Sequence, residues 1–263
     1  MSAVGVRVSP EWLALREPAD AAARSAELAG RLARHLAAAG PLVIHDLGGG
    51  SGAMGRWLAP RLPGPQHWVL HDRDVDLLER AVAAPPAAPA VTVEARHSDV
   101  TDLPPGELAD ASLVVASALL DLLTADELAR MLAACRGRPM LLALTVVGRV
   151  EMCPADALDA RVAAAFDAHQ RRGRRLGPDA VAAAVDALRG TGAELLVRQS
   201  PWRLDATRAD LTAEWLGGWI EAACEQEPAL SADAVAYRDR RLAQAAAGAL
   251  AVTVDHADLL VLP

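Results

Sequence analysis

The 263-residue chain contains no lysine and no asparagine, so arginine and histidine supply all of its basic side chains. Without lysine, the chain cannot form a Schiff base with a carbonyl substrate or with a pyridoxal cofactor. It also cannot supply the lysine that a Walker-type loop places on a nucleotide phosphate. These absences exclude lysine-dependent aldol-type chemistry, pyridoxal enzymes and P-loop nucleotide hydrolases.

Cysteine is also scarce: Cys135, Cys153 and Cys224 are odd in number, far apart, and form no C-x-x-C pair. This pattern argues against a disulfide framework and against a zinc site. We therefore expect no metal in the protein. A reducing cytoplasm is the simplest location for a chain with so few thiols.

Long hydrophobic runs are missing as well. The longest apolar stretches, Leu113–Leu120 and Met140–Val147, are too short to span a bilayer. We expect them to be buried strands and expect no membrane partner. The beginning of the chain carries acidic residues and no apolar centre, which is unlike a secretory signal.

The net charge of −8 does not provide the basic surface that nucleic-acid binding normally needs. The expected partner is therefore a small molecule and not a nucleic acid. Nothing in the sequence distinguishes a monomer from a homodimer, and we expect one of these two.

Short apolar segments alternate with helical segments over the first 150 residues, which predicts a doubly wound, mostly parallel α/β sheet with helices on both faces. The expected strands are residues 41–46, 67–72, 91–96, 111–117 and 139–147, followed by 193–199 and a final strand near the C-terminus. The length suits one such domain with helical additions.

We expect residues 1–40 to form a helical lid that includes Trp12, with residues 9–39 helical. Residues 41–263 are then the Rossmann-like domain. Helical additions at about 150–177 and 205–248 follow the fifth and sixth strands, where they can enclose a substrate.

A glycine-rich loop follows the first expected strand. Asp46, Gly48, Gly50 and Gly52 form the pattern D-x-G-x-G-x-G. Glycines let the backbone turn sharply and approach a ligand closely, and the N-terminus of the next helix favours an anionic group. Because Gly50, Gly52 and Gly55 also fit the dinucleotide pattern G-x-G-x-x-G, the loop alone leaves two ligand classes open.

Acidic residues at the next strand ends narrow this choice. Asp72 ends the second strand and is placed to bind two ribose hydroxyls, a device that NAD-binding folds also use. Asp99 follows the third strand, where a carboxylate can accept a hydrogen bond from the adenine amino group. An oxidoreductase of the Tyr-x-x-x-Lys type is excluded because lysine is absent.

At this point the chain resembles the class I, seven-stranded family of S-adenosylmethionine (SAM)-dependent methyltransferases. The resemblance covers about residues 41–147, with a weaker similarity at the C-terminal strands. The matching segments are His45–Gly52, Leu70–Ala81, His97–Pro104 and Ala111–Asp121. They are specific for the cofactor and say little about the methyl acceptor.

The resemblance implies that Gly48, Gly50 and Gly52 pack under the methionine and ribose parts of SAM. It implies that Asp46 helps to hold the methionine ammonium group. S-adenosyl-L-homocysteine is then the product that leaves the same site.

By the same resemblance, Asp72 binds both ribose hydroxyls. Asp99 meets adenine N6, and the Val100 amide meets adenine N1. Ser117, at the end of the fourth strand, is expected beside the reactive methyl group.

A hydroxyl or carbon acid generally needs a base before it accepts a methyl group. His169, in the insertion after the fifth strand, is the first candidate, although it also fits a histidine on a helix surface. Asp121, just beyond the fourth strand in an apolar run, is the second, with a solvated acid as the alternative. His256, near the last strand, is a weaker candidate.

Leu211, Trp215, Trp219 and Ala222 share one face of an expected helix. They fit either the roof of an apolar acceptor pocket or plain core. The sequence therefore predicts a methyltransferase acting on a small molecule such as a specialised metabolite, with O-methylation favoured over N- or C-methylation. The alternatives are an NAD(P)-dependent oxidoreductase and a non-catalytic SAM-binding protein.

Overall fold

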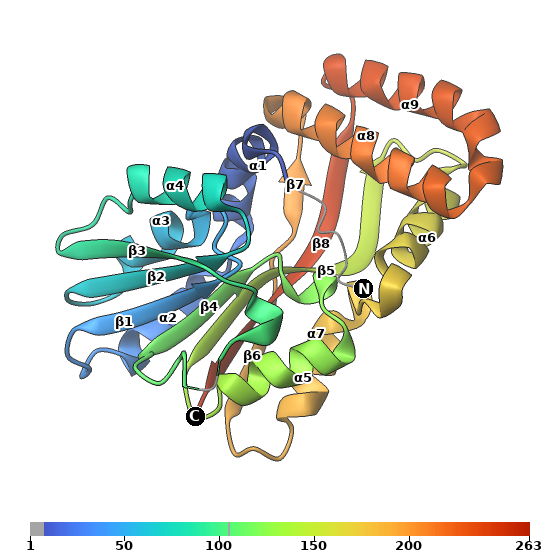
Figure 1. Cartoon of the computed structure of the whole chain (residues 1–263). Coiled ribbons are helices and arrows are strands. Elements are labelled where there is room, and N and C mark those ends of the chain that lie inside the picture. Colours follow the sequence, from blue (N-terminus) through green and yellow to red (C-terminus); the bar gives the residue numbers. More distant parts are fainter. Residues whose placement is uncertain (1–7, 105) are drawn as a thin grey trace.

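The computed structural model describes residues 8–104 and 106–263, which form a twisted sheet between helices (Figure 1). The strand order is β3-β2-β1-β4-β5-β8-β6, and β7 pairs with β8. Strands β1 to β5 are parallel, whereas β8 is antiparallel to both β5 and β6. The strands are β1 (Leu42–Leu47), β2 (Gln66–Asp72), β3 (Val91–His97), β4 (Leu113–Ser117), β5 (Met140–Cys153), β6 (Glu194–Gln199), β7 (Trp202–Leu204) and β8 (Ala251–Leu262). The predicted doubly wound, mostly parallel sheet is confirmed, with β7 as an addition.

Helices cover both faces of this sheet. Helices α2 and α3 pack on one face, and α5 and α7 on the other. The helices are α1 (Pro10–Ala23), α2 (Ala26–His35), α3 (Ala53–Leu58), α4 (Val75–Ala83), α5 (Ala125–Ala134), α6 (Asp159–Gln170), α7 (Ala180–Leu188), α8 (Ala209–Gln226) and α9 (Ser231–Ala246).

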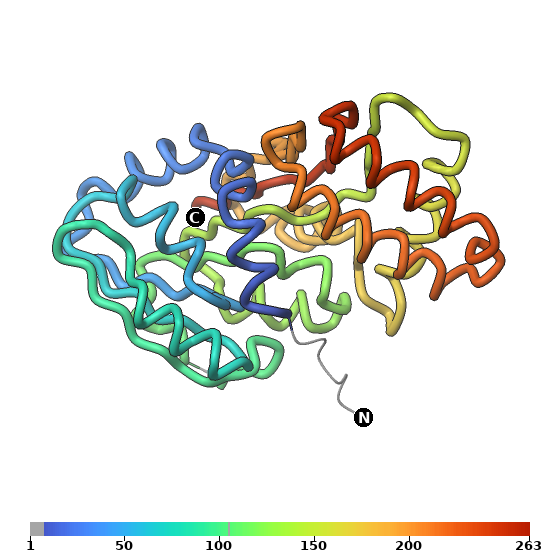
Figure 2. Tube along the Cα trace, turned by 90° about the horizontal axis from the view of Figure 1, so that it is seen from above, coloured from blue at the N-terminus to red at the C-terminus, as the bar shows by residue number. Residues whose placement is uncertain are grey.

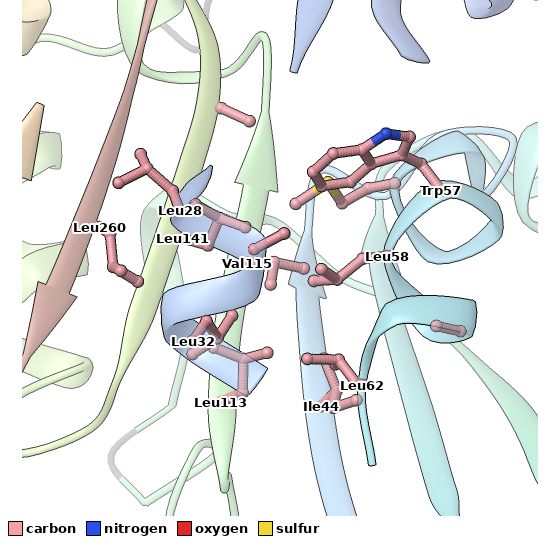
Figure 3. Packing of buried hydrophobic residues seen from close by; sticks show 14 of the residues in the cluster. Leu28, Leu32, Ile44, Trp57, Leu58, Leu62, Leu113, Val115, Leu141 and Leu260 are labelled. Carbon is pink, nitrogen blue, oxygen red and sulfur yellow. The ribbon is translucent and has the colours of Figure 1, made fainter. Parts of the chain in front are cut away.

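The core on the α2 side shows how the helix period produces this packing. Leu28 and Leu32, one turn apart on α2, are fully buried against Ile44 of β1 and Leu141 of β5 (Figure 3). Complete burial of a leucine side chain stabilises the fold by about 1.5–3 kcal/mol. The apolar face of α2 therefore makes it a core helix.

The predicted helical segment 9–39 is divided into two helices by an extended residue. Arg24 has φ −53° and ψ 138°, so α1 ends before it. The Ser25 side chain then caps α2 by accepting a hydrogen bond from the Leu28 N–H. This break turns the chain, and α1 lies between the α3–α4 region and α8 (Figure 2).

Strands β5 and β8 continue past the other strands as a two-stranded ribbon, to which β7 is added. Helices α6, α8 and α9 pack beside this ribbon around a third hydrophobic cluster that includes Trp202, Trp219 and Tyr237. The ribbon therefore positions the helical additions over one end of the sheet.

A buried carboxylate ties the ribbon to the break between α1 and α2. The register between β5 and β8 shifts near Leu144, which has a positive φ of 55°. Asp258 accepts hydrogen bonds from Leu144 N at 2.8 Å and from Ser25 N at 2.7 Å. One side chain thus satisfies two backbone N–H groups that no helix or strand pairs.

We expect Asp258→Ala to lower the free energy of unfolding by about 3 kcal/mol or more, because each buried donor left without an acceptor costs about 1–3 kcal/mol. Urea unfolding followed by circular dichroism measures this loss. Asp239→Asn, at an exposed position on α9, is the control and should change stability by less than about 0.5 kcal/mol. Equal stability of the two variants would contradict the proposed tie.

Candidate active site

The glycine loop lies between β1 and α3, at the carboxyl ends of the parallel strands. Gly48, Gly50 and Gly52 have φ values of 68°, 51° and 82°, a region that L-residues with side chains rarely adopt. At Gly52 an added Cβ would also lie 3.2 Å from the Cβ of Ala81. The three glycines therefore allow a turn that other residues would strain.

Asp72 at the end of β2 is joined directly to this loop. Its Oδ2 accepts a hydrogen bond from Gly50 N at 2.8 Å, and its Oδ1 accepts one from Asp74 N at 2.9 Å. The carboxylate is therefore fixed in orientation, and the structure brings Asp72 and Gly50 together as the sequence predicts.

Asp99 lies in the turn after β3. Its Oδ1 accepts hydrogen bonds from Thr101 N at 2.9 Å and from Arg73 Nη2 at 2.6 Å. Partial burial opposes ionisation, but these hydrogen bonds outweigh it and hold the pKa of Asp99 below its ordinary value. The next residue, Val100, is buried. The turn is therefore ordered around an ionised carboxylate.

Asp46 is a buried acid without a hydrogen-bond partner. It lies near the end of β1, is fully buried, and neither carboxylate oxygen is hydrogen-bonded within residues 8–104 and 106–263. Burial raises the pKa of Asp46 to about 7, although the charge of Arg24 acts in the opposite direction. A carboxylate in this position is costly unless a cation or donor meets it.

Arg24 is the matching buried cation. Its Nη2 donates to Ser117 Oγ at 3.1 Å, and its guanidinium carbon lies 5.6 Å from the centre of the Trp57 ring. Its Nε and Nη1 have no acceptor among the described residues. Burial lowers the pKa of Arg24, and the nearby acids Asp20 and Asp46 partly offset this.

Sequence reasoning missed Arg24. In the sequence, Arg24 is one of several arginines in a helical segment, and nothing there shows that the helix breaks at this residue. The only available signal is Ser25, a good N-cap residue that precedes the apolar face of α2. A second helix start at Ser25 would have placed Arg24 in a turn.

A second group of polar side chains surrounds Asp121, in the short 3₁₀ turn Leu120–Leu122 after β4. Asp121 is buried, and no described residue donates to its Oδ1. Burial raises the pKa of Asp121 to about 6, and the charges of Arg16 and Arg175 moderate the shift. An acid of this kind can act as a base near neutral pH.

His256 on β8 also lies near Arg16. Burial lowers the pKa of His256 to about 3, and Arg16 adds to the effect. Its Nδ1 and the Thr145 hydroxyl on β5 are buried and unpaired in the described part of the chain. Several polar groups from separate elements therefore remain available for a ligand on this side.

His169, the other predicted base, lies in the last turn of α6. Its Nε2 is 3.1 Å from Glu225 Oε2 on α8, and the same Glu225 oxygen accepts from Arg172. The described contacts join His169 to neither Asp121 nor the glycine loop. The structure thus brings Asp46, Asp72 and Ser117 together at one edge and places His169 between two added helices.

One alanine after β4 and one leucine within β5 carry backbone strain. Ala118, just after β4, has φ 52°, and Leu144 on β5 has φ 55°. A positive φ in a residue with a side chain costs on the order of 1–3 kcal/mol and is common at binding sites. Both residues lie next to the groups described above.

Within residues 8–104 and 106–263, no three His, Cys, Asp or Glu side chains gather in a way that could hold a metal ion. In the same ranges, no helix has the length and apolar composition needed to cross a membrane.

Residues 44–138 match the family model described as a methyltransferase domain. This segment contains the glycine loop, Asp72, Asp99, Ser117 and Asp121. No curated protein sequence matches the chain.

Solved structures share the fold at low identity. A protein described as a methyltransferase from Bacillus halodurans C-125 is 16% identical, with a TM-score of 0.50 and coverage of 90% of this chain and 97% of that one. The cyclopropane synthase MmaA2 from Mycobacterium tuberculosis is 15% identical, with a TM-score of 0.51 and coverage of 97% and 94%. The YcgJ protein from Bacillus subtilis is 11% identical, with a TM-score of 0.50 and coverage of 90% and 99%.

The sheet order and the helical layers define a Rossmann-like fold, and residues 44–138 within it match the methyltransferase domain. These residues thus contain a methyltransferase domain, and the chain as a whole shares the fold of these solved structures, in line with the resemblance of its motifs to the class I SAM-dependent methyltransferases. The oxidoreductase alternative has no support from these findings.

The Asp46 carboxyl gives a test that needs no ligand. Its pKa is about 7 in the folded protein and near the ordinary 3.8 in the unfolded chain. The unfolded state therefore binds fewer protons over this interval, and the folded protein loses stability as the pH rises through it. Between about pH 5.5 and 8 the loss is about 2 kcal/mol, because the slope is about 1.36 kcal/mol per pH unit below the folded pKa and disappears above it.

We therefore expect the unfolding free energy of wild type to fall, relative to Asp46→Asn, by about 2 kcal/mol between about pH 5.5 and pH 8. Chemical unfolding at several pH values measures this difference. Parallel pH profiles for the two proteins would show that Asp46 is ionised across the whole range.

Proposed function

We propose that this methyltransferase transfers the methyl group of SAM to a hydroxyl group of a small molecule. The acceptor is held between the carboxyl ends of the strands and the helical additions. The observation that carries the cofactor site is the buried pair Arg24 and Asp46, which has opposite charges and unsatisfied polar atoms on both members.

A methionine moiety fits this pair chemically, because it ends in an α-carboxylate and an α-ammonium group. Arg24 has two donors free for the carboxylate, and Asp46 has two acceptor oxygens for the ammonium. Hydrogen bonds to charged groups contribute about 1.5–3 kcal/mol each. When bound, SAM supplies an electrophilic methyl group, and the protein needs mainly to align the acceptor with it.

The remaining cofactor contacts follow the strand ends. Asp72, oriented by Gly50 N and Asp74 N, would bind the ribose hydroxyls with its remaining lone pairs. Asp99 and the Val100 amide would meet adenine N6 and N1. Gly48, Gly50 and Gly52 would lie under the methionine and ribose, where a side chain would block close approach.

The lid is proposed to be α1 alone, because α2 is part of the core. A Cβ added to Gly50 would lie 3.7 Å from Leu13 Cδ1, so α1 covers the glycine loop. Glu17 accepts two hydrogen bonds from Arg56 at 2.6 Å each, which holds α1 against α3. Residues 1–7 of the predicted lid lie outside the described residues.

For a hydroxyl acceptor we propose Asp121 as the base and His169 as the alternative. Asp121 is buried beyond β4, in the same segment as Ser117, and its raised pKa suits proton removal near neutral pH. His169 already contacts Glu225, so it fits a role in joining α6 to α8. An acid as base favours O-methylation, since a neutral amine needs little help.

Calorimetric titration with S-adenosyl-L-homocysteine tests the cofactor site. We expect wild type to bind it and not NADH. Arg24→Met and Asp72→Asn should each weaken binding by about 10- to 100-fold, the equivalent of one lost charged hydrogen bond. Arg31→Met, on the surface of α2, is the matched control and should bind as wild type does. If Arg24→Met binds S-adenosyl-L-homocysteine as tightly as wild type does, Arg24 does not bind the carboxylate of the ligand.

Methyl transfer to a panel of hydroxylated small molecules tests the base. With an accepted substrate, the rate should rise with pH around an apparent pKa near 6, set by Asp121. Asp121→Asn should lower kcat by about 100-fold and abolish this rise. Its affinity for S-adenosyl-L-homocysteine should equal that of wild type. His169→Gln should keep the pH profile. The reverse pattern would make His169 the base.

A further inference from the structure

A cleft of about 350 Å³ lies between α1, α6 and α8. Its walls combine aromatic rings with carboxylates and include no basic side chain. The side chains that define it, here called the aromatic cleft, are Trp12, Phe166, Trp215, Trp219, Glu214 and Glu221.

The aromatic wall is a packed group of rings. Trp215 and Trp219 stack with centroids 5.2 Å apart, and Phe166 lies 6.5 Å from Trp219. The faces of such rings carry partial negative charge and attract cations. In a chain with one phenylalanine, one tyrosine and six tryptophans, this concentration of rings is a specific feature of the cleft.

The acidic part of the wall is unpaired. Glu214 and Glu221 lie two turns apart on α8, and neither forms an ion pair or hydrogen bond with a described residue. Trp219 Nε1 is buried and also has no acceptor in the described part of the chain. Two other exposed acids at the end of α8 do have partners: Glu225 pairs with Arg172, and Glu227 pairs with Arg161.

Ring contacts connect the aromatic cleft to the acceptor side. Trp12 meets Trp202 edge-on with centroids 6.3 Å apart, and Trp202 lies 5.3 Å from the His256 ring. Arg16 lies over Trp202, 5.0 Å from the ring centre, and its charge acts on Asp121 as well. Two ring-to-ring contacts therefore separate the cleft from the proposed reaction side.

We propose that the aromatic cleft binds an aliphatic ammonium group of the methyl acceptor. This inference rests on the proposed function and adds the substrate class: a small molecule with a cationic amine at one end and the reacting hydroxyl at the other. The rings receive the cation, the two glutamates complement its charge, and Trp219 Nε1 donates to a neighbouring oxygen of the acceptor.

Choline and its neutral isostere 3,3-dimethylbutan-1-ol are suitable probes, since they match in shape and differ in charge. Binding is followed by the indole NMR signals of Trp215 and Trp219 in protein with ¹⁵N-labelled tryptophan. We expect choline to shift these signals with at least about fivefold higher affinity than the alcohol. Equal affinity, or no saturable choline binding, would overturn the proposal.

Glu214→Gln/Glu221→Gln keeps the shape of the cleft and removes its charge. It should weaken choline binding at least about fivefold and leave the alcohol unaffected. Asp233→Asn/Asp239→Asn removes two exposed charges from α9 and should bind choline as wild type does. If both double variants behave alike, a general charge effect explains the binding and the proposal fails.

A second variant fills the cleft without threatening the fold. Gly217 lines the cleft, and a Cβ added there meets no atom within 4 Å, so Gly217→Leu should fold and exclude choline. Binding of S-adenosyl-L-homocysteine should be unchanged in all these variants. If wild type binds choline but does not bind S-adenosyl-L-homocysteine, the proposed cofactor site is wrong and the cation site stands. If Gly217→Leu binds choline as tightly as wild type does, the cleft is not the cation site, whereas the proposed cofactor site is unaffected.

Discussion

The site depends on two buried opposite charges that do not fully satisfy each other. Arg24 and Asp46 lie at the ends of α1 and β1, and each keeps polar atoms without a partner among the described residues. Burial moves the pKa of each toward its neutral form. Such an arrangement is costly for the protein alone, so it is reasonable only where a ligand with both charges completes it. This is why a zwitterionic methionine group fits here.

The parts of this site that the sequence predicts are those with local patterns. The glycine loop and Asp72 follow a buried strand, and parallel strands bring their carboxyl ends to one edge, so these residues meet as expected. The parallel arrangement of the first five strands follows from the alternation of short apolar segments with helical segments. Strands β5 and β8 are longer than predicted. Their outer parts pair with each other beyond the main sheet, and their side chains pack against the added helices.

The other parts of the site are not predicted by the sequence, because they depend on contacts between residues that are distant in the chain. Arg24 lies beside Ser117 only because Ser25 starts a new helix, and Asp258, 233 residues away, accepts the Ser25 N–H. The same Asp258 supports the irregular backbone at Leu144. No local pattern relates these residues, so the sequence predicts neither the break before α2 nor the strained backbone within β5. The contact of His169 is hidden in the same way, because its partner Glu225 lies on another helix, 56 residues further along the chain.

Helix α1 contacts both of the proposed ligand sites and therefore couples them. Trp12 and Arg16 lie one turn apart on the same side of α1. Trp12 lines the aromatic cleft, and Arg16 lies over Trp202, near Asp121 and His256. The neighbouring side places Leu13 over Gly50 and Glu17 on Arg56. A rigid helix cannot move one set of contacts without the other. Closure of α1 over the cofactor would therefore also shape the acceptor side, so that each ligand would stabilise the helix position that the other needs.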